Sequence, residues 1–261
     1  MKRLIILTIG IMLMSTQVLA FDLMGPTTSR HKDSGKSSIA VEYFWSNMEI
    51  DADSIYELGL PSDTISDFEM SKITANLALG MGRGSEIFFR FGVAEADPDN
   101  NSDWGGIPGN MGSSDEALLL GGGAKWTLYE EADFAWGLIT QMSWAEYDFD
   151  GRSYSVGAHS VMFSPDFELF EIQIATGPTV RVNEDVIVYG GPFLYFLTGE
   201  ADLKGTIDGT PAKVDADLEQ ESILGGYIGV GLELSPKMDL AFEVQTTSGS
   251  YGLGGQFVWK F

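Results

Sequence analysis

The feature of this sequence that most constrains its fold is a strict alternation of apolar residues with polar or small ones. In residues 251–261, large apolar side chains occupy almost every second position, from Tyr251 to Phe261. The same pattern recurs around Phe242, Ile172 and Trp136. A two-residue period places successive side chains on opposite faces of a β-strand, so each segment predicts a strand with one apolar face.

The alternating segments are separated by short polar turns and longer acidic loops, in turn. This asymmetry is typical of the two ends of an outer-membrane barrel. We therefore predict an all-β fold, a transmembrane antiparallel up-and-down β-barrel of about 10 strands, within a range of about 8 to 12. The predicted strands are residues 37–50, 68–82, 85–97, 115–129, 133–148, 167–182, 185–202, 219–235, 238–248 and 251–261.

The start of the chain has the pattern of a secretory signal peptide. A basic start, Met1 to Arg3, precedes an apolar run that is too short to span a bilayer as a helix. We expect a signal peptide over residues 1–20 with cleavage near Ala20, an N-terminal periplasmic tail over residues 21–36, and an outer-membrane barrel over residues 37–261. No later apolar run is long enough for a transmembrane helix, so membrane insertion has to use strands.

Composition excludes several classes of protein. The chain has no cysteine, so disulfides and a lipid-modified cysteine are excluded. A net charge of -23 argues against a nucleic-acid partner. Much of the acidity lies in the predicted extracellular loops, and we hypothesise weak binding of divalent cations there. Residues 97–103 lack the glycine and glutamate of a calcium loop, so we assign no metal site and no cofactor.

Large aromatic side chains gather toward the ends of the predicted strands, as in the two girdles of a membrane barrel. The alternative is a secreted β-sandwich, in which the apolar faces of two sheets would pack against each other. The predicted girdle residues are Tyr43, Trp45, Trp126, Phe134, Trp136, Trp144, Phe196, Tyr251, Trp259 and Phe261.

Extending the alternation places a balanced set of acids and bases on the interior face. We interpret them as ion pairs that fill a narrow lumen, since an unpaired buried charge is costly. The alternative to a filled lumen is a thin water path, for which glycines on the interior face would leave room. The strand at 185–202 has no clearly polar face, so its sides are not assigned. The predicted lumen charges are Glu42, Lys72, Arg90, Lys125, Glu171, Arg181, Glu233, Asp239, Glu243 and Lys260.

The final residues, from Gln256 to Phe261, resemble the terminal strand of outer-membrane proteins, which alternates apolar residues and ends on an aromatic. That resemblance implies an outer-membrane location in contact with lipid and lipopolysaccharide. It also implies that Phe257, Trp259 and Phe261 form an assembly signal for the barrel-assembly machinery. The size of the chain is similar to small barrels of the opacity, OmpX-like or OmpW-like type, and the subfamily stays open.

Three functional classes follow from this architecture. A structural or surface-interaction barrel is favoured by the ion-paired interior, and a narrow channel for small solutes or ions is the alternative. A lipid A-modifying enzyme is less favoured, because the chain has only two histidines, His31 and His159. Ser160 follows His159, but neighbouring side chains on a strand point to opposite faces. We therefore expect no catalytic residues.

Overall fold

The computed structural model describes residues 22–29, 33–53, 63–98, 103–104, 107–108, 113–150, 152–156, 159–219 and 223–261. The predicted signal peptide, its cleavage site and His31 lie outside these ranges, as does most of the first acidic loop. Within the described part of the chain, no helix is long and apolar enough to cross a membrane.

Ten of the twelve strands in the main sheet close into a ring, in which β14 pairs with β1 and β9 pairs with β10. All neighbours are antiparallel, which confirms the predicted fold class. The ring strands are β1 (Ser37–Asp53), β2 (Asp63–Gly82), β3 (Ser85–Pro98), β6 (Ala117–Glu131), β7 (Phe134–Asp148), β9 (His159–Arg181), β10 (Val186–Ile207), β12 (Leu224–Ser235), β13 (Met238–Thr246) and β14 (Tyr251–Lys260).

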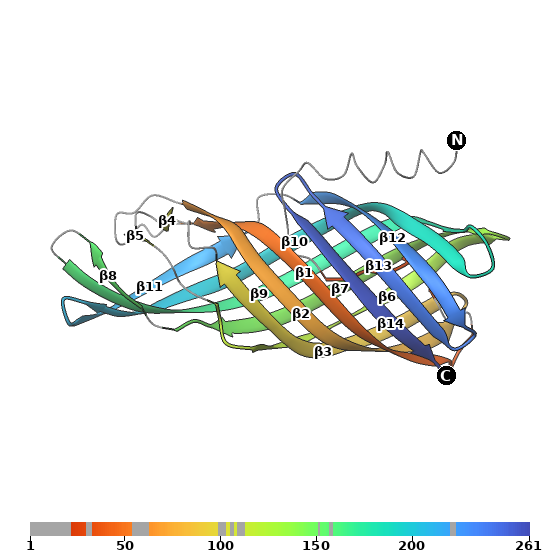
Figure 1. Ribbon diagram of the computed structural model, residues 1–261, viewed down its shortest axis with the longest axis horizontal. Helices are drawn as coiled ribbons and strands as arrows, with labels where there is room; N and C mark the ends of the chain where they lie inside the picture. The colour runs from red at the N-terminus through yellow and green to blue at the C-terminus, as the bar shows by residue number, and fades with distance from the viewer. Residues whose placement is uncertain are drawn as a thin grey trace.

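The two ends of the barrel differ, as Figure 1 shows along its long axis. At one end, beside the C-terminus, short turns join the strands, and Arg83 and Ala132 adopt positive φ angles of 55° and 41° there. We call this the short-turn end. At the opposite, long-loop end, hairpins extend the wall beyond the closed ring. They contain β8 (Arg152–Val156) and β11 (Thr210–Glu219), while β4 (Asp103–Trp104) and β5 (Ile107–Pro108) form a separate small pair.

The long hairpins are a difference from the sequence expectation, which left residues 149–166 and 203–218 as loops. Strand β10 continues to Ile207, and its last part, from Thr198 onward, pairs with the whole of β11. Asp208 and Gly209 form the turn between them with φ angles of 49° and 77°. Two residues with positive φ match the twist of a two-residue hairpin, so the chain extends the wall instead of forming an irregular loop.

Across most of the wall, apolar side chains point outward and polar side chains point inward. On β1, for example, Val41 is 58% exposed whereas Glu42 is 4% exposed. The described strands of the main sheet close into one ring rather than two facing sheets, which excludes the sandwich. All ten predicted girdle residues lie on this outward face, exposed or half-buried.

Toward the long-loop end, the chemical character of the two faces reverses, so that apolar side chains point inward and polar side chains point outward. On β2, Ile73 is exposed and Lys72 is buried, but Phe68 and Met70 are buried while Glu69 is exposed. The same reversal occurs on β9, where Leu169 is buried and Glu168 is exposed. An apolar exterior with a polar interior suits lipid, and a polar exterior with an apolar interior suits water. We call the part of the wall with an apolar outer surface the apolar belt. The reversal marks its edge on the side of the long-loop end.

Candidate functional site

Polar side chains from eight strands converge in the middle of the lumen. We call this group the polar cage. Its members occupy inward positions in the alternation of their strands, and all are buried. The polar cage consists of Glu42 on β1, Lys72, Thr74 and Asn76 on β2, Arg90 on β3, Lys125 on β6, Gln141 on β7, Glu171 and Gln173 on β9, Tyr195 on β10, and Glu243 and Gln245 on β13.

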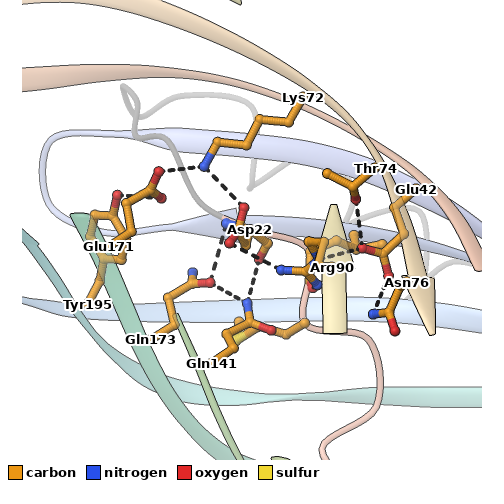
Figure 2. Close-up of polar contacts among 12 residues, drawn as sticks. Asp22, Glu42, Lys72, Thr74, Asn76, Arg90, Gln141, Glu171, Gln173 and Tyr195 are labelled. Carbon is orange, nitrogen blue, oxygen red and sulfur yellow. Dashed lines mark hydrogen bonds and ion pairs between the residues drawn. The ribbon is translucent and has the colours of Figure 1, made fainter. Parts of the chain in front are cut away.

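Asp22 lies at the centre of the polar cage, although it belongs to the segment before the first strand (Figure 2). Its carboxylate lies 3.1 Å from Lys72 Nζ and 3.1 Å from Arg90 Nη1. Lys72 Nζ also lies 2.6 Å from Glu171 Oε1, and Arg90 Nε lies 2.8 Å from Glu42 Oε2. Acids and bases therefore alternate in one chain of ion pairs across the lumen, from β9 to β1.

Neutral side chains satisfy the remaining acceptors of this chain. Thr74 Oγ1 and Asn76 Nδ2 each donate to the Glu42 carboxylate at 3.1 Å. The Tyr195 hydroxyl donates to Glu171 Oε2 at 2.9 Å. Buried charges are costly unless they are paired and hydrogen-bonded, and these donors supply hydrogen bonds to both carboxylates.

Glutamine side chains of the polar cage hold the backbone of Asp22. The Asp22 amide donates to Gln173 Oε1 at 3.3 Å. Its carbonyl accepts hydrogen bonds from Gln141 Nε2 at 3.2 Å and from Gln245 Nε2 at 2.9 Å. The buried amide and carbonyl of Asp22 are thus hydrogen-bonded to side chains rather than to the backbone of a neighbouring strand.

Charged side chains of the cage hold the next peptide groups. The amides of Met24 and Gly25 donate to the two oxygens of the Glu243 carboxylate, at 3.0 and 2.9 Å. Lys125 Nζ donates to the carbonyls of Met24 and Pro26, at 2.7 and 2.9 Å. Arg90 Nη2 completes the set by donating to the carbonyl of residue 23 at 2.8 Å. Residues 22–26 are therefore bound mainly through their backbone, which turns at Gly25, where φ is 63°.

The location of residues 22–29 differs from the sequence expectation of a periplasmic tail over residues 21–36. Residues 22–27 are buried inside the barrel, and Leu23 and Met24 join its apolar core. The physical reason is that the lumen presents donors and acceptors that nothing else in the described chain fills. No local pattern in this segment signals that role, because its partners lie 50 or more residues away.

The ten predicted lumen charges divide into two groups. Six belong to the polar cage: Glu42, Lys72, Arg90, Lys125, Glu171 and Glu243. The other four lie partly exposed at the short-turn end, where Lys260 Nζ is 2.8 Å from Asp239 and 3.9 Å from Glu233, and Arg181 Nη1 is 3.7 Å from Glu233. Sequence reasoning missed Asp22 and also Glu86, a buried carboxylate that accepts a hydrogen bond from Ser29 Oγ at 3.2 Å.

Above the polar cage, toward the long-loop end, the lumen is filled by apolar side chains. We call this the apolar layer. Phe167 lies at its centre, with ring centroids 6.1 Å from Phe68 and 4.9 Å from Phe149. The structure also turns Tyr189, Phe193 and Tyr195 of β10 inward, which settles the unassigned faces of that strand. The apolar layer consists of Met48, Ile50, Phe68, Met70, Leu119, Tyr147, Phe149, Phe167, Leu169, Leu197 and Leu218.

Below the polar cage, a pocket of about 240 Å³ opens at the short-turn end. Pro26, Thr28 and Ser29 line its upper side, and Arg181 and Lys260 line its wall together with Glu233 and Asp239. The charged lining comprises five acids and two bases: Glu130, Asp133, Asp185, Glu233 and Asp239, with Arg181 and Lys260 paired to Glu233 and Asp239.

The described residues contain no cluster of candidate metal ligands. Among them, no three side chains of His, Cys, Asp or Glu are placed to hold a metal ion. The backbone of His159 pairs with Val156 in the β8–β9 hairpin, and that of Ser160 pairs with Ser155. Their side chains, like those of the acidic residues at 51–67, lie outside what the structure describes.

A closed antiparallel ring with an apolar exterior, a polar interior, short turns at one end and long hairpins at the other defines an outer-membrane β-barrel protein. No protein-family model matches the chain, and no curated protein matches its sequence.

Three solved structures of similar shape are distant in sequence. The outer membrane protease OmpT from Escherichia coli has 12% identity and a TM-score of 0.46 over 88% of this chain and 95% of its own. The translocator domain of the autotransporter NalP from Neisseria meningitidis has 12% identity and a TM-score of 0.48, over 89% and 90%. An outer membrane channel from Pseudomonas putida F1 has 11% identity and a TM-score of 0.45, over 92% and 100%. These values say nothing about what the chain binds or does.

Proposed function

We propose that this protein is a closed outer-membrane barrel that acts in structural support or surface interaction rather than in transport. The observation that carries the proposal is the filling of the lumen in two successive layers. The ion pairs of the polar cage and the bound segment 22–29 occupy its middle, and the apolar layer occupies the part above. Either layer alone obstructs a water path.

The outer surface above the apolar belt supports a role in surface interaction. The extended hairpins turn acidic side chains outward, and Glu168, Glu200, Asp217 and Glu219 border a shallow hollow there. Lipopolysaccharide phosphates are anionic, so contact between the two surfaces requires bridging divalent cations. We include such cations among the proposed partners, together with outer-membrane lipid and lipopolysaccharide.

The C-terminal strand supports the proposed location and assembly route. Strand β14 closes the ring against β1, and Phe257, Trp259 and Phe261 point outward from it. We propose that this strand is read by the barrel-assembly machinery after the leader has been cleaved near Ala20. A gel comparison of boiled and unboiled outer-membrane fractions tests the location, because a folded barrel migrates differently from its unfolded chain.

Planar-bilayer recording separates the closed barrel from the narrow channel. The mature protein is inserted at both polarities beside a general porin as a positive control. We expect no steady conductance from this chain. Steady openings that persist at both polarities would contradict the proposal and favour the channel, which is the second candidate because residues 22–29 are held only by noncovalent bonds.

A further inference from the structure

The polar cage has the properties of a peptide-binding site rather than of a simple filling. Its side chains bond main-chain groups of each residue from 22 to 26, with donors for the carbonyls and acceptors for the amides. Recognition of a peptide backbone needs both hydrogen-bond donors and acceptors along its length, whereas side chains that only fill space do not need to provide them. The Asp22 side chain adds one charged contact, to Lys72 and Arg90 (Figure 2).

The bound segment has a defined direction. Asp22 meets the mid-strand residues Lys72 and Gln173, deep in the lumen. Ser29, at the other end, lies near the short-turn end, where its amide donates to Thr127 Oγ1 and its hydroxyl donates to Glu86 Oε2. The segment therefore enters from the short-turn end, with its N-terminal residue innermost.

The lumen beyond Asp22 is closed to a longer chain. The inward positions next above Lys72 and Glu171 are Met70 and Leu169, and each is at most 1% exposed. Further up lie Phe68 and Phe167, both fully buried. A leader of about 20 residues with a basic end would have to pass through this apolar layer, which has no groups to satisfy its backbone or charges.

The charge in the lumen favours a nearby cation. Buried ionisable side chains in the described part of the lumen number five acids against three bases. The α-ammonium group produced by cleavage near Ala20 would lie within a few ångströms of Asp22 and offset part of this negative excess. A chain that still carries its leader has no such group there. The acids are Asp22, Glu42, Glu86, Glu171 and Glu243, and the bases are Lys72, Arg90 and Lys125.

We infer that the polar cage is a binding site for the chain's own processed N-terminus, a peptide segment that begins close to Asp22 with a free amine. The site takes this ligand only after the leader has been removed. Occupation of the lumen is therefore coupled to maturation, since the barrel reaches its fully packed state only as the processed chain.

Thiol labelling measures this directly, because the chain has no cysteine of its own. Leu23→Cys is introduced into residues 21–261 and into residues 1–261, and both chains are refolded in the same detergent. Leu23 is 3% exposed in the lumen, so a maleimide should react slowly with the processed chain. We expect reaction about tenfold or more faster in the leader-bearing chain, where the segment stays undocked.

Two controls keep the test decisive. Ser34→Cys, at an exposed position, should react equally fast in both chains. Met24→Cys, at another buried position, replaces Leu23→Cys if that variant gives no heat-modifiable band. Equal protection of the buried cysteine in the two chains would overturn the inference, because the cage would then accept the segment with its leader attached. Faster labelling after acetylation of the processed chain's amine is expected, and an unchanged rate would refute the role of the free amine.

Discussion

The ammonium group of Lys72 on β2 lies 2.6 Å from a carboxylate oxygen of Glu171 on β9, on the far side of the lumen. The two strands are not neighbours in the ring, so this ion pair connects opposite walls of the barrel. Lys72 is the shared partner of Glu171 and Asp22, and it is one of the largest fully buried side chains. Its loss would leave Glu171 without a cation and Asp22 with Arg90 alone.

We therefore expect Lys72→Met to lower the free energy of unfolding by about 3–5 kcal/mol, since breaking a buried pair leaves an uncompensated charge. Urea unfolding in phospholipid vesicles, followed by tryptophan fluorescence, measures the change. Lys204→Met is the matched control, because Lys204 also lies 2.6 Å from a carboxylate, that of Asp166, but is more than half exposed. The control should be indistinguishable from the native protein. Equal losses in both variants would contradict the buried ion-pair network.

A second prediction concerns the close approach of β9 and β10. Their paired register is interrupted between Ala175 and Thr179, where each strand has a proline that lacks an amide hydrogen. A Cβ atom at Gly177 would lie 2.0 Å from the Gly190 carbonyl oxygen, so the strands would have to separate. We expect Gly177→Ala to cost about 1–3 kcal/mol in the same unfolding assay.

Gly226→Ala is the control for that substitution. Its added Cβ would meet nothing nearer than 3.9 Å, at the carbonyl oxygen of Gly191 in the same region of the wall. We expect its stability to stay within about 0.5 kcal/mol of the native protein. If both alanines were tolerated equally, the strands would not be held as close as described.

Sequence reasoning predicted the fold because alternation is a local property. Val41 and Glu42 are neighbours in the chain, and their opposite environments follow from the pleat alone. Alternation alone does not explain why the apolar Phe68 and Met70 share the inward face of β2 with the predicted lumen residue Lys72. Above the apolar belt the outer surface of the barrel contacts water. The same two-residue alternation therefore places apolar side chains inside and polar side chains outside.

The centre of the polar cage lay beyond sequence reasoning for a different reason. Lys72 and Glu171 were predicted from alternation to face the lumen, but Asp22 belongs to a segment with no periodicity. Its position is decided by partners on β2 and β3 that lie 50 or more residues along the chain. Only the assembled lumen shows that residues 22–26 have a set of donors and acceptors to bind.

A third prediction tests where the apolar belt ends. Phe242 lies at the middle of β13, faces outward and is 51% exposed. Phe242→Arg should cost about 2–4 kcal/mol in lipid vesicles, as expected for a cation near the bilayer midplane. Thr198 also faces outward, but it lies on β10 above the reversal of faces. Thr198→Arg should cost about 0–1 kcal/mol, and a comparable cost at both positions would contradict the assigned boundary.

The fourth prediction concerns which layer seals the lumen. Phe68 and Phe167 stack with a centroid separation of 6.1 Å in the apolar layer, and both are fully buried. Replacing both with alanine leaves a cavity and should lower stability by about 3–5 kcal/mol or more. In planar bilayers we expect this double variant to stay closed, because the polar cage and residues 22–29 still fill the lumen below it.

The same double substitution combined with Asp22→Asn also weakens the second obstruction, since Asp22 loses the charge that pairs it with Lys72 and Arg90. We expect brief openings only in this triple variant, with Asp22→Asn alone remaining silent because the apolar layer is intact. Circular dichroism and the heat-modifiable band verify that each variant is folded before recording. Openings from Asp22→Asn alone would show that the polar cage is the only seal, and the closed barrel would then be a gated channel.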